Sequence, residues 1–187
     1  METQRSREEM FEILDRNTAW IENCDNKASI ILGVIGVVAG VFLGTNYVEK
    51  LYSIILLMIS KEHLSICSIL YIFIMVASVA GMIVGCLFII DVLVPRFRME
   101  EYQKRGSASD SVIHYASIAK HKTFAKFRNK LVGLSNEAML DDLAEQIYIC
   151  AIICENKFTA YKKGLITCVV SFLIFIFMVI LGFIITK

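Results

Sequence analysis

The chain has 187 residues, of which 57% are hydrophobic, and its mean hydropathy is +0.64. This composition excludes an ordinary soluble domain of the same size and indicates a membrane protein. The net charge of only +1 gives no bulk basic character, so nucleic acid is not expected as a partner.

The chain begins with a charged segment that continues without a break into an apolar one. One helix is predicted from about residue 8 to about residue 44, because no proline or glycine precedes Gly33 and a packed stripe recurs every three or four positions. Residues 1–27 are expected to form a cytoplasmic helix and residues 28–48 a first transmembrane helix. The stripe consists of Met10, Leu14, Asn17, Ile21, Cys24 and Ala28.

Four residues mark the junction between these two parts. Trp20 fits the aromatic belt of a membrane interface, and Lys27 can extend its ammonium back to the headgroups. Asp25 shares a helix face with Ser29. A carboxylate at the start of a span is either a boundary marker or a functional group that faces a partner charge or water, and both interpretations stay open for Asp25.

Glycines four residues apart occur in two of the predicted spans. Gly36 and Gly40 lie in the first, and Gly81 and Gly85 in the second. This spacing lets two helix backbones approach closely in lipid, so we expect helix contacts at these positions and a homo-oligomer formed through the spans. The two glycine-bearing helices are candidates for touching each other. The alternative is an ordinary glycine-rich membrane helix.

The remaining apolar runs complete the predicted topology. Residues 49–63 are expected to form an external loop with a short interfacial helix, residues 64–94 a second transmembrane helix that ends before Pro95, and residues 165–186 a third. Residues 96–164 carry twelve basic and eight acidic side chains. The positive-inside rule therefore places this region and the N-terminus in the cytoplasm of a multi-pass membrane protein.

Residues 96–164 are predicted to be helical. A long helix is expected from Asn136 into the third span, capped by Ser135, with an apolar stripe that packs on the Met10–Ala28 stripe. Asp142 and Gln146 share one of its faces, which favours packing or an inter-helix hydrogen bond. The basic residues before the third span, namely Lys157, Lys162 and Lys163, are expected to face the inner headgroups.

The fold class is therefore an all-α membrane protein with three transmembrane helices and a helical cytoplasmic region formed by the N-terminal helix and residues 96–164. The six cysteines include no C-x-x-C pair, and no metal site or cofactor is expected. No catalytic triad, phosphate loop or paired carboxylates with a base is present, so an enzyme is not expected.

Two motifs carry a resemblance to a known family. One is W-I-x-x-x-D-x-K-A-S, from Trp20 to Ser29, and the other is D-L-A-x-Q-I-Y, from Asp142 to Tyr148, followed by Lys157. With these motifs the chain resembles the Pycsar transmembrane effectors of bacterial antiphage defence over nearly its whole length. The resemblance implies a pyrimidine nucleotide cyclase as functional partner. It also implies an activating cyclic pyrimidine mononucleotide, cyclic UMP or cyclic CMP, and impairment of the membrane.

A nucleotide site in such a chain must be built from helix faces, with basic groups for the phosphate and an aromatic slot for the base. The candidates are Arg96, Arg98, Tyr115, Lys120 and Arg128. Alternatively, the two arginines after the second span anchor the inner leaflet, and the later cations belong to a solvated helix face. A function of a different class also stays open, namely a constitutive helical membrane scaffold or assembly protein without ligand gating.

Overall fold

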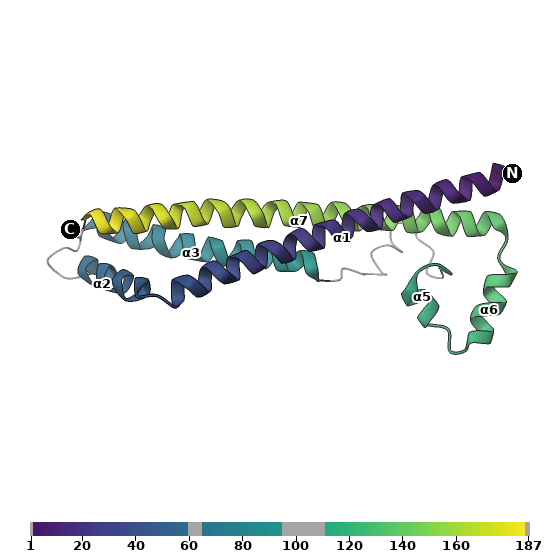
Figure 1. Ribbon diagram of the computed structural model, residues 1–187, viewed down its shortest axis with the longest axis horizontal. Coiled ribbons are helices and arrows are strands. Elements are labelled where there is room, and N and C mark those ends of the chain that lie inside the picture. Colours follow the sequence, from purple (N-terminus) through teal and green to yellow (C-terminus); the bar gives the residue numbers. More distant parts are fainter. Residues whose placement is uncertain (1, 60–64, 95–110, 186–187) are drawn as a thin grey trace. The chain divides into compact units, whose positions relative to one another are not determined.

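A computed structural model describes residues 2–59, 65–94 and 111–185. Within these ranges every regular element is a helix (Figure 1). The predicted all-α fold class is confirmed. The helices are α1 (Glu2–Leu43), α2 (Tyr47–Ile59), α3 (Ile66–Leu93), α5 (Tyr115–Ala119), α6 (Phe124–Gly133) and α7 (Asn136–Ile185).

The chain divides into two compact units. The polar unit comprises Met1–Cys24 and Pro95–Lys157, and the apolar unit comprises Asp25–Val94 and Phe158–Lys187. Helices α1 and α7 each contribute to both units. Together with α3 they are long and apolar enough to cross a membrane, as the sequence predicted.

The helix ends follow local chemistry that is visible in the sequence. The Ala138 backbone N–H donates to Ser135 Oγ at 3.2 Å, which confirms the predicted cap of α7. Helix α3 ends at Leu93, and Val94 is extended with φ −74° and ψ 125°, because the residue before a proline avoids helical geometry. Both predicted long helices are continuous, and α7 is about 75 Å long at 1.5 Å per residue.

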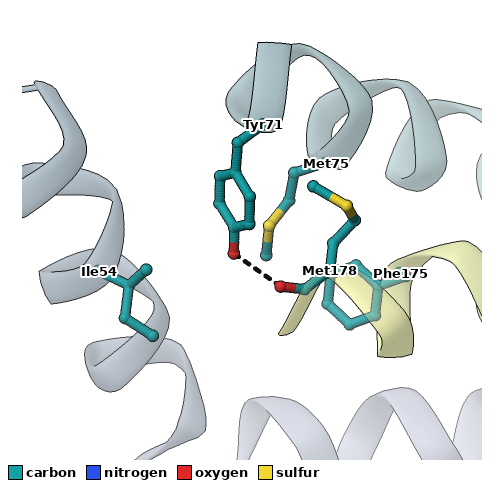
Figure 2. Close-up of a cluster of buried hydrophobic side chains, with 5 residues drawn as sticks. All are labelled: Ile54, Tyr71, Met75, Phe175 and Met178. Carbon is teal, nitrogen blue, oxygen red and sulfur yellow. Dashed lines mark hydrogen bonds between the residues drawn. The ribbon is translucent and has the colours of Figure 1, made fainter. Parts of the chain in front are cut away.

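Helix α2 occupies most of the predicted external loop. It is a separate helix that begins two residues earlier than the loop boundary at residue 49. Ile54 of α2 is buried in a cluster with side chains from α3 and α7 (Figure 2). In this cluster, Tyr71 Oη donates to the Met178 backbone carbonyl at 2.8 Å. Packing against α3 and α7 therefore holds α2 in place within the apolar unit.

The closest helix approach in the apolar unit is made by the α3 glycines. A Cβ added at Gly85 would lie 2.7 Å from the backbone N of Cys168 and 3.0 Å from the carbonyl oxygen of Gly164. At Gly81 an added Cβ would clash with the Ser171 hydroxyl. The neighbour of these glycines is thus α7, which presents its own small residues at spacings of four and three.

The α1 glycines are placed differently. A Cβ added at Gly36 or Gly40 would meet no atom within 4 Å. The expectation that the two glycine-bearing helices touch each other through these residues is therefore wrong for the single chain. The glycine spacing indicates a surface that allows close approach, but it does not identify the partner helix, and α7 supplies the matching small surface.

We predict that Gly85→Ile destabilises the apolar unit by about 1–3 kcal/mol, because the new side chain would overlap backbone atoms of α7 that cannot move independently. The free energy of unfolding of the detergent-solubilised full chain measures this effect. The matched control is Gly40→Ile, which introduces the same side chain into open space and should leave folding of the single chain unchanged. Equal losses for both variants would contradict the assigned contact.

Candidate functional site

A hydrogen-bonded turn anchored on α7 is the best-defined polar site in the polar unit. The Val112 backbone N–H donates to Asp142 Oδ2 at 2.8 Å. Gln146 Nε2 lies 3.5 Å from Asp142 Oδ1, one helical turn further along α7. Val112 and Gln146 are both buried, so the carboxylate satisfies a donor that water cannot reach. The sequence predicted packing or an inter-helix hydrogen bond at this face, whereas the donor to Asp142 lies in the segment before α5.

The same turn organises the start of α5. Ser111 Oγ accepts hydrogen bonds from the backbone N–H groups of Ile113 and His114, both at 3.0 Å. His114 Nδ1 then accepts the Ala116 N–H at 3.2 Å and caps α5. Short polar side chains close such turns by binding backbone donors two or three residues away. The sequence analysis did not single out Ser111, although a serine directly after the polar linker 106–110 is a recognisable turn signal.

His114 has an altered protonation equilibrium. Burial lowers the pKa of His114, the positive charge of Lys120 lowers it further, and the negative charge of Asp142 opposes both effects. The imidazole is therefore favoured in the neutral form, which is the form that can accept the Ala116 N–H. Its ring lies beside that of Tyr115, with the centroids 4.7 Å apart.

Three of the five predicted ligand residues lie within the described ranges. Arg96 and Arg98 lie outside the described residues. The Tyr115 side chain is 70% exposed. Lys120 forms the C-cap of α5, and both Lys120 and Arg128 are exposed. Tyr115 and Lys120 thus lie at opposite ends of one short helix, whereas Arg128 lies on α6.

Helix α1 packs on α7 within the polar unit, as the two stripes predicted. Asn17 Nδ2 donates to the Ile147 carbonyl at 3.4 Å. Leu143 and Cys24 are fully buried, and the α1 stripe positions before Cys24 are half-buried. The second motif thus contributes Leu143 and Gln146 to the interior, while Tyr148 remains exposed.

The first motif lies where α1 passes from one unit to the other, between Cys24 and Asp25. Trp20 is 52% exposed, Asp25 is half-buried and Lys27 is exposed. Ser29 Oγ donates to the Asp25 backbone carbonyl at 2.9 Å, so this hydroxyl is satisfied within α1 itself.

Helix α7 likewise passes from the polar unit to the apolar unit, directly after Lys157. Lys157 does not have the orientation expected of a headgroup-facing residue, because its side chain is only 8% exposed. Lys162 and Lys163 are exposed. The difference follows from helix rotation, since Lys157 shares its face with the buried Ala160 and Gly164. A buried cation next to an apolar unit is unusual, and such a residue is a candidate for a functional role.

Metal chemistry finds no support in the described ranges. No group of three or more His, Cys, Asp or Glu side chains there could hold a metal ion. Cys86 and Cys168 are a pair of neighbouring thiols, whose Sγ atoms are 3.9 Å apart at the α3–α7 contact. There the thiols act as small packing groups.

A family model described as the Pycsar effector protein domain matches residues 9–185. The chain belongs to this family. The resemblance that the two motifs indicated is therefore confirmed.

Two curated relatives cover nearly the same length. The Pycsar effector protein GmPycTM of Gulbenkiania mobilis is 25% identical over 183 residues, which cover 91% of this chain and 89% of that protein. The Pycsar effector protein EcPycTM of Escherichia coli is 24% identical over 193 residues, with 95% of each chain covered. No solved structure matches the chain.

We predict that Asp142→Ala releases the turn before α5. The variant leaves the buried Val112 N–H without an acceptor, which costs about 1–3 kcal/mol. Amide hydrogen exchange of residues 111–119 in the full chain should therefore accelerate, while exchange in α3 stays unchanged. Asp141→Ala is the control, because Asp141 is the exposed neighbour of Asp142. Equal exchange in both variants would show that the carboxylate does not hold the turn.

Proposed function

We propose that this Pycsar effector responds to a cyclic pyrimidine mononucleotide and impairs the integrity of the inner membrane of an infected bacterium. A pyrimidine nucleotide cyclase would make the activating ligand, cyclic UMP or cyclic CMP. In this proposal the N-terminus and residues 96–164 lie in the cytoplasm, and the chain acts as an effector without catalytic activity of its own. The family match over residues 9–185 is the observation that carries the proposal.

The architecture supports a division of labour between the two units. Three candidate membrane spans leave residues 111–157 in a polar unit whose described elements are helices. A signal received there can reach the apolar unit along α1 and α7, because both helices are continuous. A ligand shifts such a system only if it binds two arrangements with different affinity.

The α5 segment offers the chemistry for one nucleotide. The exposed Tyr115 ring beside His114 can stack on a base, and the Lys120 ammonium can neutralise a phosphate. We propose these residues as the ligand-facing group, with Arg96 and Arg98 as candidates beyond the described ranges. Arg128 lies on α6 and is not included in this group.

Asp25 is proposed to couple ligand binding to the spans. It is the first residue of the apolar unit on α1 and is half-buried, where a carboxylate needs a counter-charge or water. The basic residues at the other span ends, Arg96, Lys162 and Lys163, are the proposed alternatives for pairing. Exchange between such pairs would connect movement in the polar unit with the state of the membrane spans.

Ligand-dependent depolarisation tests the proposed function. The full chain is reconstituted into liposomes that hold a potassium diffusion potential, and a voltage-sensitive dye reports the potential. Cyclic UMP or cyclic CMP should collapse the potential, whereas the linear nucleotides UMP and CMP should not. Protein-free liposomes are the control for leakage. An unchanged potential with both cyclic nucleotides would favour the alternative of a constitutive scaffold.

We predict that Asp25→Asn removes ligand control in the same assay. The substitution keeps the size of the side chain and removes its charge, so the ratio of depolarisation with and without nucleotide should fall to about one. Glu22→Gln is the matched control, because it neutralises an exposed carboxylate one turn earlier on α1. Normal ligand dependence in Asp25→Asn would identify Asp25 as a boundary marker only.

A further inference from the structure

Two consecutive segments of the polar unit carry opposite charge. Residues 111–135 contain five basic residues and no acidic one, namely Lys120, Lys122, Lys126, Arg128 and Lys130. Residues 136–156 contain five acidic residues and no basic one, namely Glu137, Asp141, Asp142, Glu145 and Glu155. Two adjacent segments of opposite charge thus lie in one compact unit.

Helix α6 presents an outer face that no described part of the chain covers. None of its residues is buried. Phe124 is 78% exposed and Val132 is 76% exposed, and Arg128, which lies four residues from each, is exposed as well. Residues four apart share one helix face. The α6 outer face, defined as Phe124, Arg128 and Val132, is therefore an apolar stripe with a positive charge at its centre.

Helix α7 carries a second uncovered face within the same unit. Its exposed positions recur at spacings of four and three, which is the period of a face that packs on another helix. The α7 outer face consists of Glu137, Asp141, Ala144, Tyr148 and Ala151. It carries negative charge at one end. Further along the helix, Ala144 and Ala151 lie on either side of the half-exposed ring of Tyr148.

The two faces are complementary but do not cover each other within one chain, because both remain exposed in the folded unit. We infer that the α6 outer face of one copy docks on the α7 outer face of a second copy of this chain. The two helices run antiparallel at this contact, and Phe124 fills the space that Ala144 leaves, as ridges fill grooves between packed helices. Arg128 meets the carboxylates of Glu137 and Asp141.

A second copy accounts for both faces at once. An anionic lipid surface would suit the α6 outer face, with its exposed aromatic ring and its arginine, but it would repel the acidic α7 outer face. Because each copy carries one face of each kind, a two-fold arrangement forms the contact twice with the same residues. The interface lies in the polar unit and is thus distinct from any association of the spans.

A photo-crosslinker within the proposed contact tests the inference directly. Phe124 is replaced by benzoylphenylalanine in the full chain, and membranes containing the protein are irradiated without nucleotide. The expected product is a covalent pair of copies, with the adduct mapped by mass spectrometry to a peptide within residues 136–157. Adducts with lipid alone, or with other proteins alone, would overturn the inference.

Charge exchange provides the second arm. Arg128→Glu and Asp141→Arg should each lower the crosslink yield about tenfold, because each places like charges opposite each other. The two substitutions together should restore the yield, which also shows that the variants fold. Lys126→Glu is the control, since Lys126 lies two residues from Phe124 and Arg128 and does not share their face.

Two results would contradict the docking mode. One is a crosslink yield that Arg128→Glu leaves unchanged, and the other is a double variant that crosslinks no better than the single ones. Because this assay contains no nucleotide and measures no membrane potential, its outcome is independent of the proposed response to a cyclic nucleotide.

Discussion

The structure depends on the requirement that backbone polar groups in lipid find hydrogen-bond partners within their own segment. Helices meet this requirement, and α1 and α7 continue as unbroken helices from the apolar unit into the polar unit. An isolated helix gains little stability in water from its backbone alone. The polar halves are therefore stabilised by packing on each other, as at Asn17 and Leu143. This continuity connects the polar unit with the candidate membrane spans.

Close helix packing in the apolar unit has a different origin from packing in the polar unit. In lipid, burying one leucine against another gains nothing over burying it in acyl chains, so van der Waals contact between small residues dominates. Gly81 and Gly85 provide this contact with Gly164, Cys168 and Ser171 of α7. The α1 glycines keep an open surface. The apolar unit thus retains a small-residue face that association of the spans could use.

Charged residues lie where α1 and α7 each pass from one unit to the other. These positions therefore differ chemically from the spans. Asp25 begins the apolar unit on α1, and Lys157 ends the polar unit on α7. Both side chains are at least partly removed from water, where the free energy of a charge depends strongly on its partners. Small changes in helix packing therefore have a large electrostatic effect at these positions. This sensitivity is the physical basis for proposing a switch there.

The sequence by itself determined the elements of this protein, because their signals are local. The length of the apolar runs predicted three spans, Ser135 predicted the start of α7, and Pro95 predicted the end of α3. The two stripes predicted that α1 packs on α7. Packing or an inter-helix hydrogen bond was expected at Asp142 and Gln146, but the acceptor role of Asp142 toward the Val112 backbone N–H was not predicted.

Tertiary structure decided which surfaces meet. Glycine spacing allows two helices to approach closely, but it does not identify the neighbouring helix. In the structure α7 packs on Gly81 and Gly85 and not on the α1 glycines. The rotation of α7 placed Lys157 inside, although its position before a span suggested the headgroups. The exposed faces of α6 and α7 likewise depend on which side of each helix its neighbours cover. Periodicity specifies that a helix has faces, whereas the choice of partner for each face depends on shape and charge contributed by residues far away in the chain.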